Sequence, residues 1–344
     1  MKRLTQRDIA RLAGVSQATV SLVLNGALSA EGRIPQETRE RVHKAIRETG
    51  YVADPVARRM AKGLNRILGV FTYEPAFPSA QADFFTPFLL GIEEVAQELG
   101  YDLLLLTGAV GGAQRKIFGS NTRLRLADGC IILGREFDHD ELTRLVAGDY
   151  PFVAVGRRND AGGPVPYVGS DYAAATAGLV DSARALGHTS LAYVGPSIGA
   201  ESTIDRWAGF SSAITGLDLV LHIPEVAQPA ATTLDRLLAS GATTVFFTEL
   251  ADAIQVEALA RSRGIIVPEH LSIVVLGNHI RAEQTDRHFT SFLIPREAMA
   301  RAAAQMLVRR LESEAPIQQQ LLSCEPVEGE TLGPAPLTKP KTGP

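Results

Sequence analysis

The stretch from Leu4 to Asn25 restricts the fold of this chain more than any other part of the sequence. Apolar residues recur at helical spacing on both sides of Gly14, which interrupts the pattern; they are Ile9, Leu12 and Ala13 before it and Val20, Val23 and Leu24 after it. Ser16 has the type of side chain that caps the start of a helix. The stretch therefore predicts a helix, a tight turn and a second helix.

A third apolar stripe follows within residues 36–50, where Val42, Ala45 and Ile46 share one face of a helix. Charge is unevenly divided along the chain. Residues 1–66 contain 13 Lys and Arg against 6 Asp and Glu, a net +7, and residues 67–344 contain 21 against 32, a net −11. A basic end on an acidic body is typical of a segment that meets phosphates. Three short helices with basic surfaces indicate a DNA-reading headpiece.

The motif L-T-x-x-D-I-A-x-x-A-G-V-S-x-x-T-V-S-x-x-L-N begins at Leu4, and I-P-x-x-T-R-x-x-V and G-Y follow it at Ile34 and Gly50. With these residues in this order, the chain resembles the lac repressor / gal repressor family. The resemblance extends over roughly residues 3–325, through segments such as R-W-A-G-F and I-P-R-E-A-M-A-R-A-A that are similar to the family's effector-binding core. It implies a homodimeric, ligand-responsive transcription factor, most commonly a repressor, that binds a palindromic DNA operator.

The second helix is expected to enter the major groove with the residues that face away from its apolar stripe. Similarity to the family places base contacts at Gln17, Ala18 and Leu22. Gln bonds two edges of adenine, and Ala or Leu packs on a thymine methyl group, so we expect apolar readout at Leu22, where many relatives carry Arg. The short polar residues expected to contact phosphates, or only to cap helices, are Thr5, Ser16, Thr19, Ser21 and Asn25.

Residues 54–63, DPVARRMAKG, predict a short helix with cap-forming residues at both ends. So short a helix is expected to be ordered only when DNA or a partner holds it, and a plain interdomain linker is the alternative. In the family, similar hinge helices pair across a dimer and wedge a leucine into the minor groove. Met60 matches that leucine, and Arg58 and Arg59 are expected on the phosphates.

From Leu68 the pattern changes to near-continuous apolar strands separated by amphipathic helices. Such strands indicate parallel sheets covered on both faces. The same rhythm restarts after residue 171, which indicates two doubly wound lobes. Strands are expected at 67–73, 101–107, 128–134, 150–156, 189–195, 243–249 and 271–277, and helices at 86–100, 138–148, 171–188, 202–216, 233–241 and 251–264.

The predicted fold class is an all-α helix-turn-helix headpiece followed by an α/β two-lobed core like that of periplasmic binding proteins, with two doubly wound parallel sheets. The expected domains are a DNA-binding domain at 1–52, a hinge helix or linker at 53–66, an effector-binding and dimerisation core at 67–330 and a disordered tail at 331–344. The end of the chain lacks apolar heptads, so a dimer rather than a coiled-coil tetramer is expected.

Ligands of such open sheets bind at the carboxyl ends of the strands, which favours a small-molecule site between the two lobes. The family resemblance places its main ligand-binding arginine at Arg206, and a salt-bridged surface arginine is the alternative. Asp171 matches an acid of the family's ligand cleft. Phe84 and Phe85 match aromatic positions that stack on a sugar or ring, and core packing is the alternative for both.

Two cleft positions depart from the family pattern. Glu249 and Leu250 stand where relatives usually carry Asn-Asp, and Gly277, followed by Asn278, stands where they carry Asp. Glu249 and Asn278 are still expected to contact the ligand. Because two acids that bond sugar hydroxyls are missing, a modified sugar, a glycoside or a non-sugar metabolite is favoured over an ordinary hexose as the effector. A cleft that responds to no ligand is the remaining alternative.

An enzyme is the main alternative from another class, because Gly195–Gly199 match the G-x-S-x-G elbow of hydrolases, with Ser197 as the nucleophile. Asp286 and His288 are available as acid and base, whereas His188 is expected to be a loop histidine bonded to backbone. The match is short and no oxyanion-loop glycine run accompanies it, so no enzyme is predicted. A solute-binding protein of the transport type would share the two-lobed core but needs an export signal.

The start of the chain, MKRLTQRDIARL, has charges throughout and no apolar run of a secretory signal, and no segment approaches the ~20 apolar residues of a membrane helix. Cys130 and Cys324 lie far apart without C-x-x-C spacing, so neither a disulfide scaffold nor a thiolate metal site is expected. We therefore expect a cytoplasmic protein without cofactor, metal or membrane contact. Its expected partners are double-stranded operator DNA, a small-molecule effector and a second copy of itself.

Overall fold

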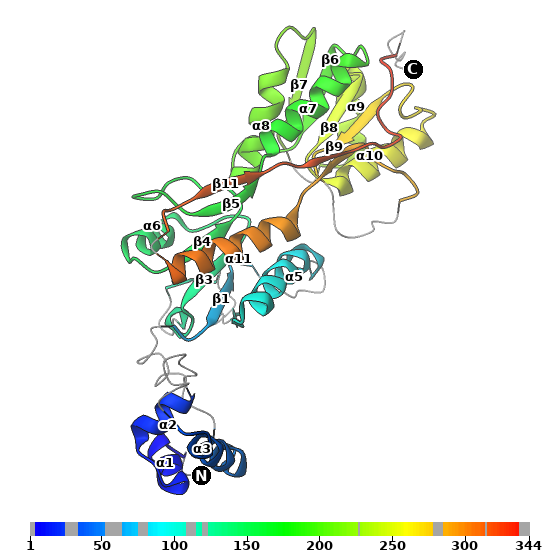
Figure 1. The fold of residues 1–344 in the computed structure, drawn as a ribbon. Helices are drawn as coiled ribbons and strands as arrows, with labels where there is room; N and C mark the ends of the chain where they lie inside the picture. The colour runs from blue at the N-terminus through cyan, green and yellow to red at the C-terminus, as the bar shows by residue number, and fades with distance from the viewer. Residues whose placement is uncertain are drawn as a thin grey trace. The chain divides into compact units, whose positions relative to one another are not determined.

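The computed structural model describes residues 4–24, 34–51, 64–74, 82–107, 115–118, 123–225, 228–277, 285–313 and 315–336. The chain divides into two compact units, Met1–Asn65 and Arg66–Pro344, named unit 1 and unit 2 below. Figure 1 shows unit 1 as a small group of helices and unit 2 as an α/β structure. Most of the expected hinge, residues 52–63, lies outside the described residues.

The described part of unit 1 consists of α1 (Gln6–Ala13), α2 (Gln17–Leu24) and α3 (Gln36–Thr49), in agreement with the predicted helix-turn-helix and third helix. A capping box starts α1, because the Thr5 hydroxyl accepts from the Asp8 amide and the Asp8 carboxylate accepts from the Thr5 amide. Gly14 ends α1 with a left-handed backbone, φ 64°, which explains the interruption of the apolar pattern by glycine.

The buried face of α1 differs in one residue from the predicted face. Ile9, Ala10 and Ala13 are buried in a cluster with Val20 of α2. Leu12 is 58% exposed, so the prediction that it belongs to this core is wrong. The helices that pack on α1 cover a face centred on Ile9 and Ala13, and Leu12 lies beyond its edge.

Lobe 1 of unit 2 is built on a parallel sheet with the strand order β11-β5-β4-β3-β1-β2. Its strands are β1 (Ile67–Thr72), β2 (Asp102–Leu106), β3 (Gly129–Leu133), β4 (Phe152–Val155), β5 (Tyr167–Ser170) and β11 (Gln319–Leu322). Ile131 and Leu133 face α5 (Ala82–Leu99) and α11 (Arg296–Glu312), whereas Cys130 and Ile132 face α6 (His139–Ala147). A 3-10 turn, η2 (Leu124–Leu126), precedes β3. The sheet is therefore covered on both faces, as predicted.

Helix α5 begins earlier than its sequence indicates. Thr86 and Pro87 are typical of a helix start, but α5 begins at Ala82 and contains Pro87. Pro87 lies close to the N-terminus, where its missing N–H removes a single intrahelical hydrogen bond. As a result, Phe84 and Phe85 lie on the first turn of α5 rather than ahead of it.

Lobe 2 is built on a second parallel sheet with the order β7-β6-β8-β9. Its elements are β6 (Ser190–Val194), β7 (Leu219–Ile223), β8 (Thr244–Phe247), β9 (Ser272–Val275), α7 (Tyr172–Ala185), α8 (Glu201–Ala213), α9 (Ala230–Ser240) and α10 (Leu250–Ser262). Tyr193 faces α7 and α8, and Ala192 and Val194 face α9 and α10. The prediction of two doubly wound parallel sheets is confirmed. β7 escapes sequence prediction because this edge strand is only partly buried.

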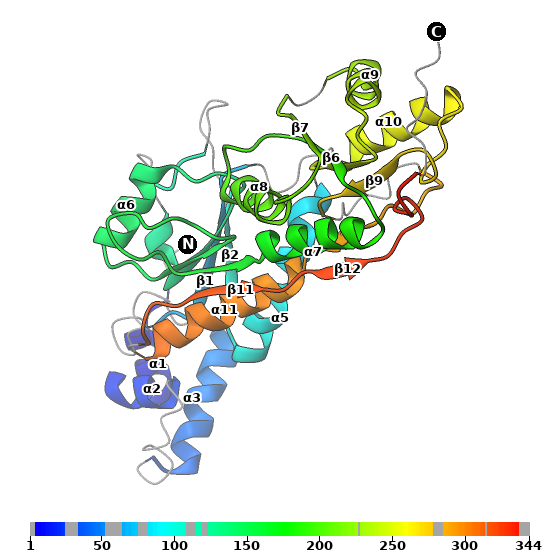
Figure 2. The same ribbon diagram turned by 90° about the horizontal axis from the view of Figure 1, so that it is seen from above.

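The last part of the chain passes between the two lobes again. β10 (Ser291–Leu293) pairs antiparallel with β12 (Glu325–Val327), and β11 pairs with β5 of lobe 1. Figure 1 shows β11 beside β5 and Figure 2 shows β12 beside α7, so this segment follows both lobes.

The first residues of the expected disordered tail are packed on lobe 2. Thr331 is fully buried, and its hydroxyl donates to the Ile273 carbonyl at 2.6 Å and accepts from the Thr290 amide at 3.0 Å. The ordered core thus extends to residue 336, and residues 337–344 lie outside the described part. Among the described helices, none is both long enough and apolar enough to cross a membrane.

Candidate nucleic-acid interface and inter-lobe site

The outer surface of α2 presents the side chains for which base contacts are predicted. Gln17, Ala18 and Leu22 are exposed, and Leu22 keeps 42% of its surface accessible. Val20, on the opposite side, is fully buried against α1 and α3. The structure thus brings the three predicted base-reading residues onto one face that the described residues of unit 1 leave exposed. A helix face of this kind fits the major groove of B-DNA.

The hydroxyl groups predicted to contact phosphates also act as helix caps. The Ser16 hydroxyl accepts a hydrogen bond from the Thr19 amide at 3.1 Å and lies 2.9 Å from the Thr19 hydroxyl. The Thr5 hydroxyl donates to the Asp8 carboxylate at 2.8 Å. Ser21 is half-buried. Asn25, Arg58, Arg59 and Met60 lie outside the described residues, and their contacts with DNA stay predictions.

Arg7 is a residue of this surface that the sequence did not single out. Its Nε atom donates to Oε1 of Gln17 at 3.2 Å, and both side chains are exposed. Because arginine only donates, this contact makes the Gln17 oxygen the acceptor and directs the amide nitrogen elsewhere. No sequence motif marks the pair, because the two residues lie on different helices and meet only when α1 packs on α2.

Arg206 on α8 lies at the junction of the two lobes. Its Nε donates to the Leu276 carbonyl at 2.8 Å and its Nη1 to the Ser202 carbonyl at 2.9 Å. The guanidinium carbon lies 4.0 Å from the centre of the Tyr172 ring and 6.0 Å from that of Phe292. Within the described residues these partners are neutral, so the salt-bridge alternative for Arg206 finds no support.

Gly277, one of the two departures from the family pattern, directly adjoins Arg206. Its backbone has a φ of +127°, which strongly favours glycine. A β-carbon there would lie 3.0 Å from Ile294 Cδ1 and 3.3 Å from Arg206 Nη2. The arginine therefore occupies the space in which the family's acid would begin, and no acid neutralises it from this position.

The other predicted ligand contacts are arranged unevenly. Asp171 caps α7, because its Oδ1 accepts from the Ala174 amide at 2.9 Å. Glu249 is exposed at the start of α10, and Asn278 lies outside the described residues. Phe85 is 2% exposed in the core, which agrees with the core alternative and not with ring stacking on a ligand. Phe84 is half-buried and keeps an accessible side.

Two arginine–carboxylate pairs that no sequence motif predicts join the lobes beside Arg206. Arg157, after β4, forms a two-pronged pair with Asp205 of α8, with Nε to Oδ2 and Nη2 to Oδ1 both at 2.7 Å. Arg158 Nη1 lies 3.0 Å from Glu201 Oε2. The hydrogen bond with Asp205 raises the pKa of Arg157, whereas burial lowers the pKa of Arg158. The only sequence signal was two arginines after a strand and two acids one helical turn apart.

The G-x-S-x-G segment does not form a hydrolase site. Ser197 lies in a loop between β6 and α8, not on a sharp turn from strand to helix. Asp286 pairs with Arg261 at 3.5 Å, and His288 is exposed. In the described structure, neither shares a hydrogen bond with Ser197. His188 is buried, with ring nitrogens 2.8 Å from the Thr243 hydroxyl and 2.9 Å from the Gly333 carbonyl, in agreement with a histidine satisfied by backbone.

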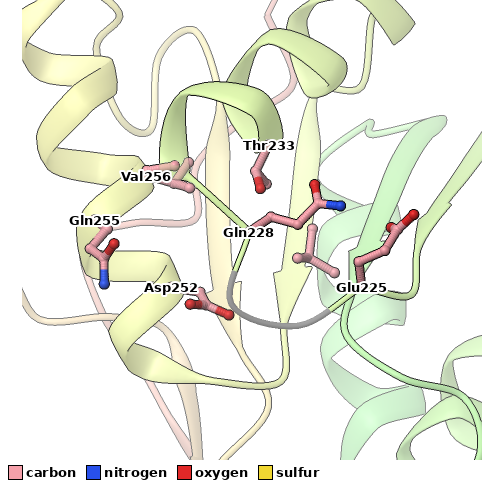
Figure 3. A pocket seen from close by; sticks show the side chains of 8 residues that line it. Glu225, Gln228, Thr233, Asp252, Gln255 and Val256 are labelled. Carbon is pink, nitrogen blue, oxygen red and sulfur yellow. The ribbon is translucent and has the colours of Figure 1, made fainter.

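A separate small pocket lies on lobe 2 at the carboxyl ends of β6 and β7 (Figure 3). Its lining residues are Val194, Glu225, Gln228, Ala230, Thr233, Asp252, Gln255 and Val256. Figure 3 shows Asp252 and Gln255 extending from α10 and Thr233 from α9. Burial raises the pKa of Asp252, and neighbouring Glu249 raises it further. This pocket contains none of the residues that the family resemblance assigns to the ligand.

Known protein families match the chain in the order of its units. Residues 5–54 match the bacterial regulatory proteins of the lacI family. Residues 76–244 match the periplasmic binding proteins and sugar binding domain of the LacI family, and residues 180–332 match a periplasmic binding protein-like domain. Together these matches cover most of the chain.

Individual relatives and solved structures agree with these matches. The HTH-type transcriptional regulator AscG of Escherichia coli is 27% identical over 301 residues, which are 85% of this chain and 87% of AscG. The regulator CelR of Thermobifida fusca is 26% identical and covers 91% and 93% of the two chains. The lac repressor dimer bound to operator and an anti-inducer is similar in fold, with a TM-score of 0.74, 21% identity and coverage of 96% and 100%. A CelR–cellobiose complex has a TM-score of 0.60, 25% identity and the same coverage.

Proposed function

The chain belongs to the lacI family of bacterial regulatory proteins, and from this premise we propose that it is a repressor that binds a palindromic operator as a homodimer and responds to a small-molecule effector. The family is one of DNA-binding transcription regulators, not of enzymes. In this proposal, residues 1–52 read DNA, 53–66 connect, and the core from residue 67 to residue 336 binds the effector and pairs with a second copy.

DNA binding by this chain is supported above all by the exposed face of α2 in a folded headpiece. Gln17, Ala18 and Leu22 lie together there, on the segment whose net charge is +7. One such helix reads only a few base pairs, so two headpieces are needed, and the two-fold symmetry of a dimer calls for a palindromic operator. The similar lac repressor structure is described as a dimer bound to operator, which supports this arrangement.

The effector half rests on the inter-lobe position of Arg206. Its guanidinium, held by two backbone carbonyls and an aromatic ring, is placed to bind a polar small molecule at the carboxyl ends of the strands. The similar CelR structure contains cellobiose, which supports a sugar or a related metabolite as the effector class. A ligand that prefers one arrangement of the two lobes changes the DNA affinity by the free-energy difference between its two affinities. We propose that ligand binding relieves repression.

The DNA half is tested by gel shift of the full-length protein on promoter DNA adjoining its own gene. Replacing Gln17 with Ala is expected to change the base preference at one half-site position. Replacing Arg59 with Ala is expected to lower the affinity for all DNA sequences alike. A salt series on the same DNA should show affinity that falls steeply with ionic strength, because each neutralised phosphate releases counterions. Binding that ignores sequence or salt contradicts the proposal.

The dimer is tested on the same preparations. Sedimentation equilibrium is expected to give twice the chain mass, and an operator with one half-site scrambled is expected to lose most of its affinity. A protein that binds a single half-site as tightly as a palindrome contradicts the homodimer. An effector is sought by thermal shift of the full-length protein, since a ligand that binds only the folded state raises its stability.

A further inference from the structure

Three arginines from different elements meet at the inter-lobe site. Arg206 comes from α8 of lobe 2, Arg296 from the first turn of α11, and Arg135 from the segment after β3. The guanidinium carbons of Arg135 and Arg296 lie 5.3 and 5.8 Å from the centre of the Phe84 ring. Arg296 is only 8% exposed; burial lowers its pKa, and the positive charges of Arg206 and Arg135 also lower it. Arg296 therefore interacts with both of the other arginines as a like charge.

The carboxylates near this cluster are largely engaged elsewhere. Asp205 and Glu201 pair with Arg157 and Arg158, two further arginines, and so neutralise those. Among the described acids on neighbouring elements, Asp171 caps α7, Oε1 of Glu74 accepts from the Arg135 amide at 3.0 Å, Glu297 pairs with Arg301, and Glu136 and Glu249 are exposed. No ion pair joins Arg206 to an acid within the described residues. At Arg206, the positive charge is therefore not balanced by a paired acid among the described residues.

Gly277, which stands where the family carries an acid, increases this imbalance of charge at Arg206. The family's acid at this position would lie against Arg206, but Gly277 supplies no carboxylate, and Arg206 Nη2 fills the space. An arginine with neutral partners binds an anionic oxygen more strongly than a hydroxyl, because a hydrogen bond between two charged groups is about twice as strong as one between neutral groups. The loss of the acid therefore shifts the preference of this site from hydroxyl groups toward anions.

We propose that the effector carries an anionic group, a carboxylate or a phosphate, which binds Arg206 and Arg296 between the lobes. Arg135, which is exposed, lies at the outer side of the site, and the rings of Phe84 and Tyr172 lie beside the bound molecule. This inference rests on the proposed function, namely that a small molecule binds between the lobes. It narrows the effector class from sugars in general to sugar acids, sugar phosphates and related anionic metabolites.

The test is a ligand panel in matched sets with one carbon skeleton each. Glucose, gluconate and glucose 6-phosphate form one set, galactose, galacturonate and galactose 1-phosphate a second, and inorganic phosphate is added alone. Melting temperature and calorimetric affinity of the full-length protein are measured at constant ionic strength. We expect an anionic member to raise the melting temperature and its neutral counterpart not to. The carboxylate and phosphate arms distinguish the two kinds of anion.

Variants on helix α11 provide the matched comparison. Arg296→Gln is expected to weaken the anionic ligand about tenfold or more, since one charge-assisted hydrogen bond is lost. Arg310→Gln removes a half-buried arginine whose Nη1 donates to the Phe152 carbonyl at 3.0 Å. Arg310 lies at the other end of the same helix, about 21 Å away. This variant is expected to leave the affinity unchanged. If Arg296→Gln does not fold, the exposed Arg135→Gln takes its place, with a smaller loss expected for the anion and none for a neutral sugar.

Three results overturn the inference: a neutral sugar that binds as tightly as its anionic counterpart, a panel in which no anion binds, or an Arg296→Gln loss that is equal for charged and neutral ligands. Gel shifts without ligand on the same preparations separate this failure from that of the proposed function. Sequence-specific DNA binding that no anion changes contradicts only the anionic effector. Loss of specific DNA binding contradicts the proposed function itself.

Discussion

Replacement of Glu201 by Gln tests how strongly the two lobes are held together by charge. The Arg158–Glu201 pair joins the segment after β4 in lobe 1 to the first turn of α8 in lobe 2, at 3.0 Å. The Arg158 side chain is 4% exposed and that of Glu201 17%, so the pair is largely withdrawn from water. Burial lowers the pKa of Arg158 and the charge of Glu201 raises it, which means that the carboxylate compensates the cost of burying the guanidinium.

The structure sets the size of the expected effect. Removing one partner of a buried ion pair costs about 3 to 5 kcal/mol, because the other charge stays buried. Arg158 keeps hydrogen bonds to the carbonyls of Gly134 at 2.6 Å and Arg157 at 3.0 Å, and its guanidinium carbon lies 3.8 Å from the Phe137 ring centre. We therefore expect the lower end, about 3 kcal/mol, which corresponds to a fall in melting temperature of roughly 5 °C for a unit of this size.

Glu225→Gln is the matched control for this measurement. Oε2 of Glu225 lies 3.1 Å from Nη1 of Arg236, so the pair joins the same atom types as the Glu201 pair. The Glu225 side chain, however, is 49% exposed, and the pair lies within lobe 2. Exposed pairs contribute little to stability, so its melting temperature is expected to match that of the wild type. Scanning calorimetry of both variants decides the question. A fall for Glu201→Gln that is no larger than that of the control refutes the reasoning that burial gives the inter-lobe pair its strength.

Three further outcomes are expected. Arg7→Ala should weaken base discrimination at the position that Gln17 reads and leave other positions unchanged, measured by gel shift on single-substitution operators. Burial lowers the pKa of His188 below 6.5, so its neutral ring contributes stability that is complete above pH 6.5 and is lost as the pH falls. The melting temperature of His188→Gln should therefore drop less between about pH 7 and 5 than that of the wild type. Gly209→Ala places a β-carbon against the α7 backbone and should cost about 1 to 3 kcal/mol in urea unfolding, whereas Gly178→Ala, on α7 with open space around it, should not destabilise.

The sequence predicted those parts of the fold that depend on local patterns. The spacing of Ile9, Gly14 and Val20 is enough to define two helices and a turn, and the alternation of apolar strands with helices is enough to define two parallel sheets. Leu12 was misplaced because helical spacing alone does not say which edge of a stripe the neighbouring helices cover. The packing of residues 331–336 was missed because it depends on hydrogen bonds that Thr331 and Gly333 form with lobe 2 rather than on an apolar run.

The candidate site was predicted only where one residue could be matched to the family. Arg206 was assigned in this way; it lies at the junction of the lobes, and its contact with a ligand stays a prediction. The Arg158–Glu201 and Arg157–Asp205 pairs were missed because their members are 43 and 48 positions apart in the chain and meet only through the packing of the two lobes. Charge clusters of this kind depend on tertiary structure, and no local pattern of the sequence predicts them.

Contacts within lobe 2 differ in kind from contacts between the lobes, and this difference bears on how a ligand acts. α7 and α8 approach so closely that a β-carbon at Gly209 would overlap the carbonyl of Ala173, and such backbone packing has only one stable geometry. The inter-lobe contacts of the same helix are ion pairs between side chains, a kind of contact that can rearrange when two rigid bodies rotate against each other. A ligand is therefore expected to move the lobes as rigid bodies.

Helix α8 then links the ligand to the inter-lobe pairs. Arg206 lies one residue after Asp205 and five after Glu201 on the same helix. Because the helix moves as one piece with lobe 2, an anion that draws Arg206 toward lobe 1 keeps both acids against their arginines, whereas one that displaces α8 separates all of them together. The effector and the two ion pairs thus act on a single equilibrium between lobe arrangements. A substitution that weakens a pair must therefore change the ligand affinity, and the free energy of that change equals the free energy by which the ligand changes the stability of the pair.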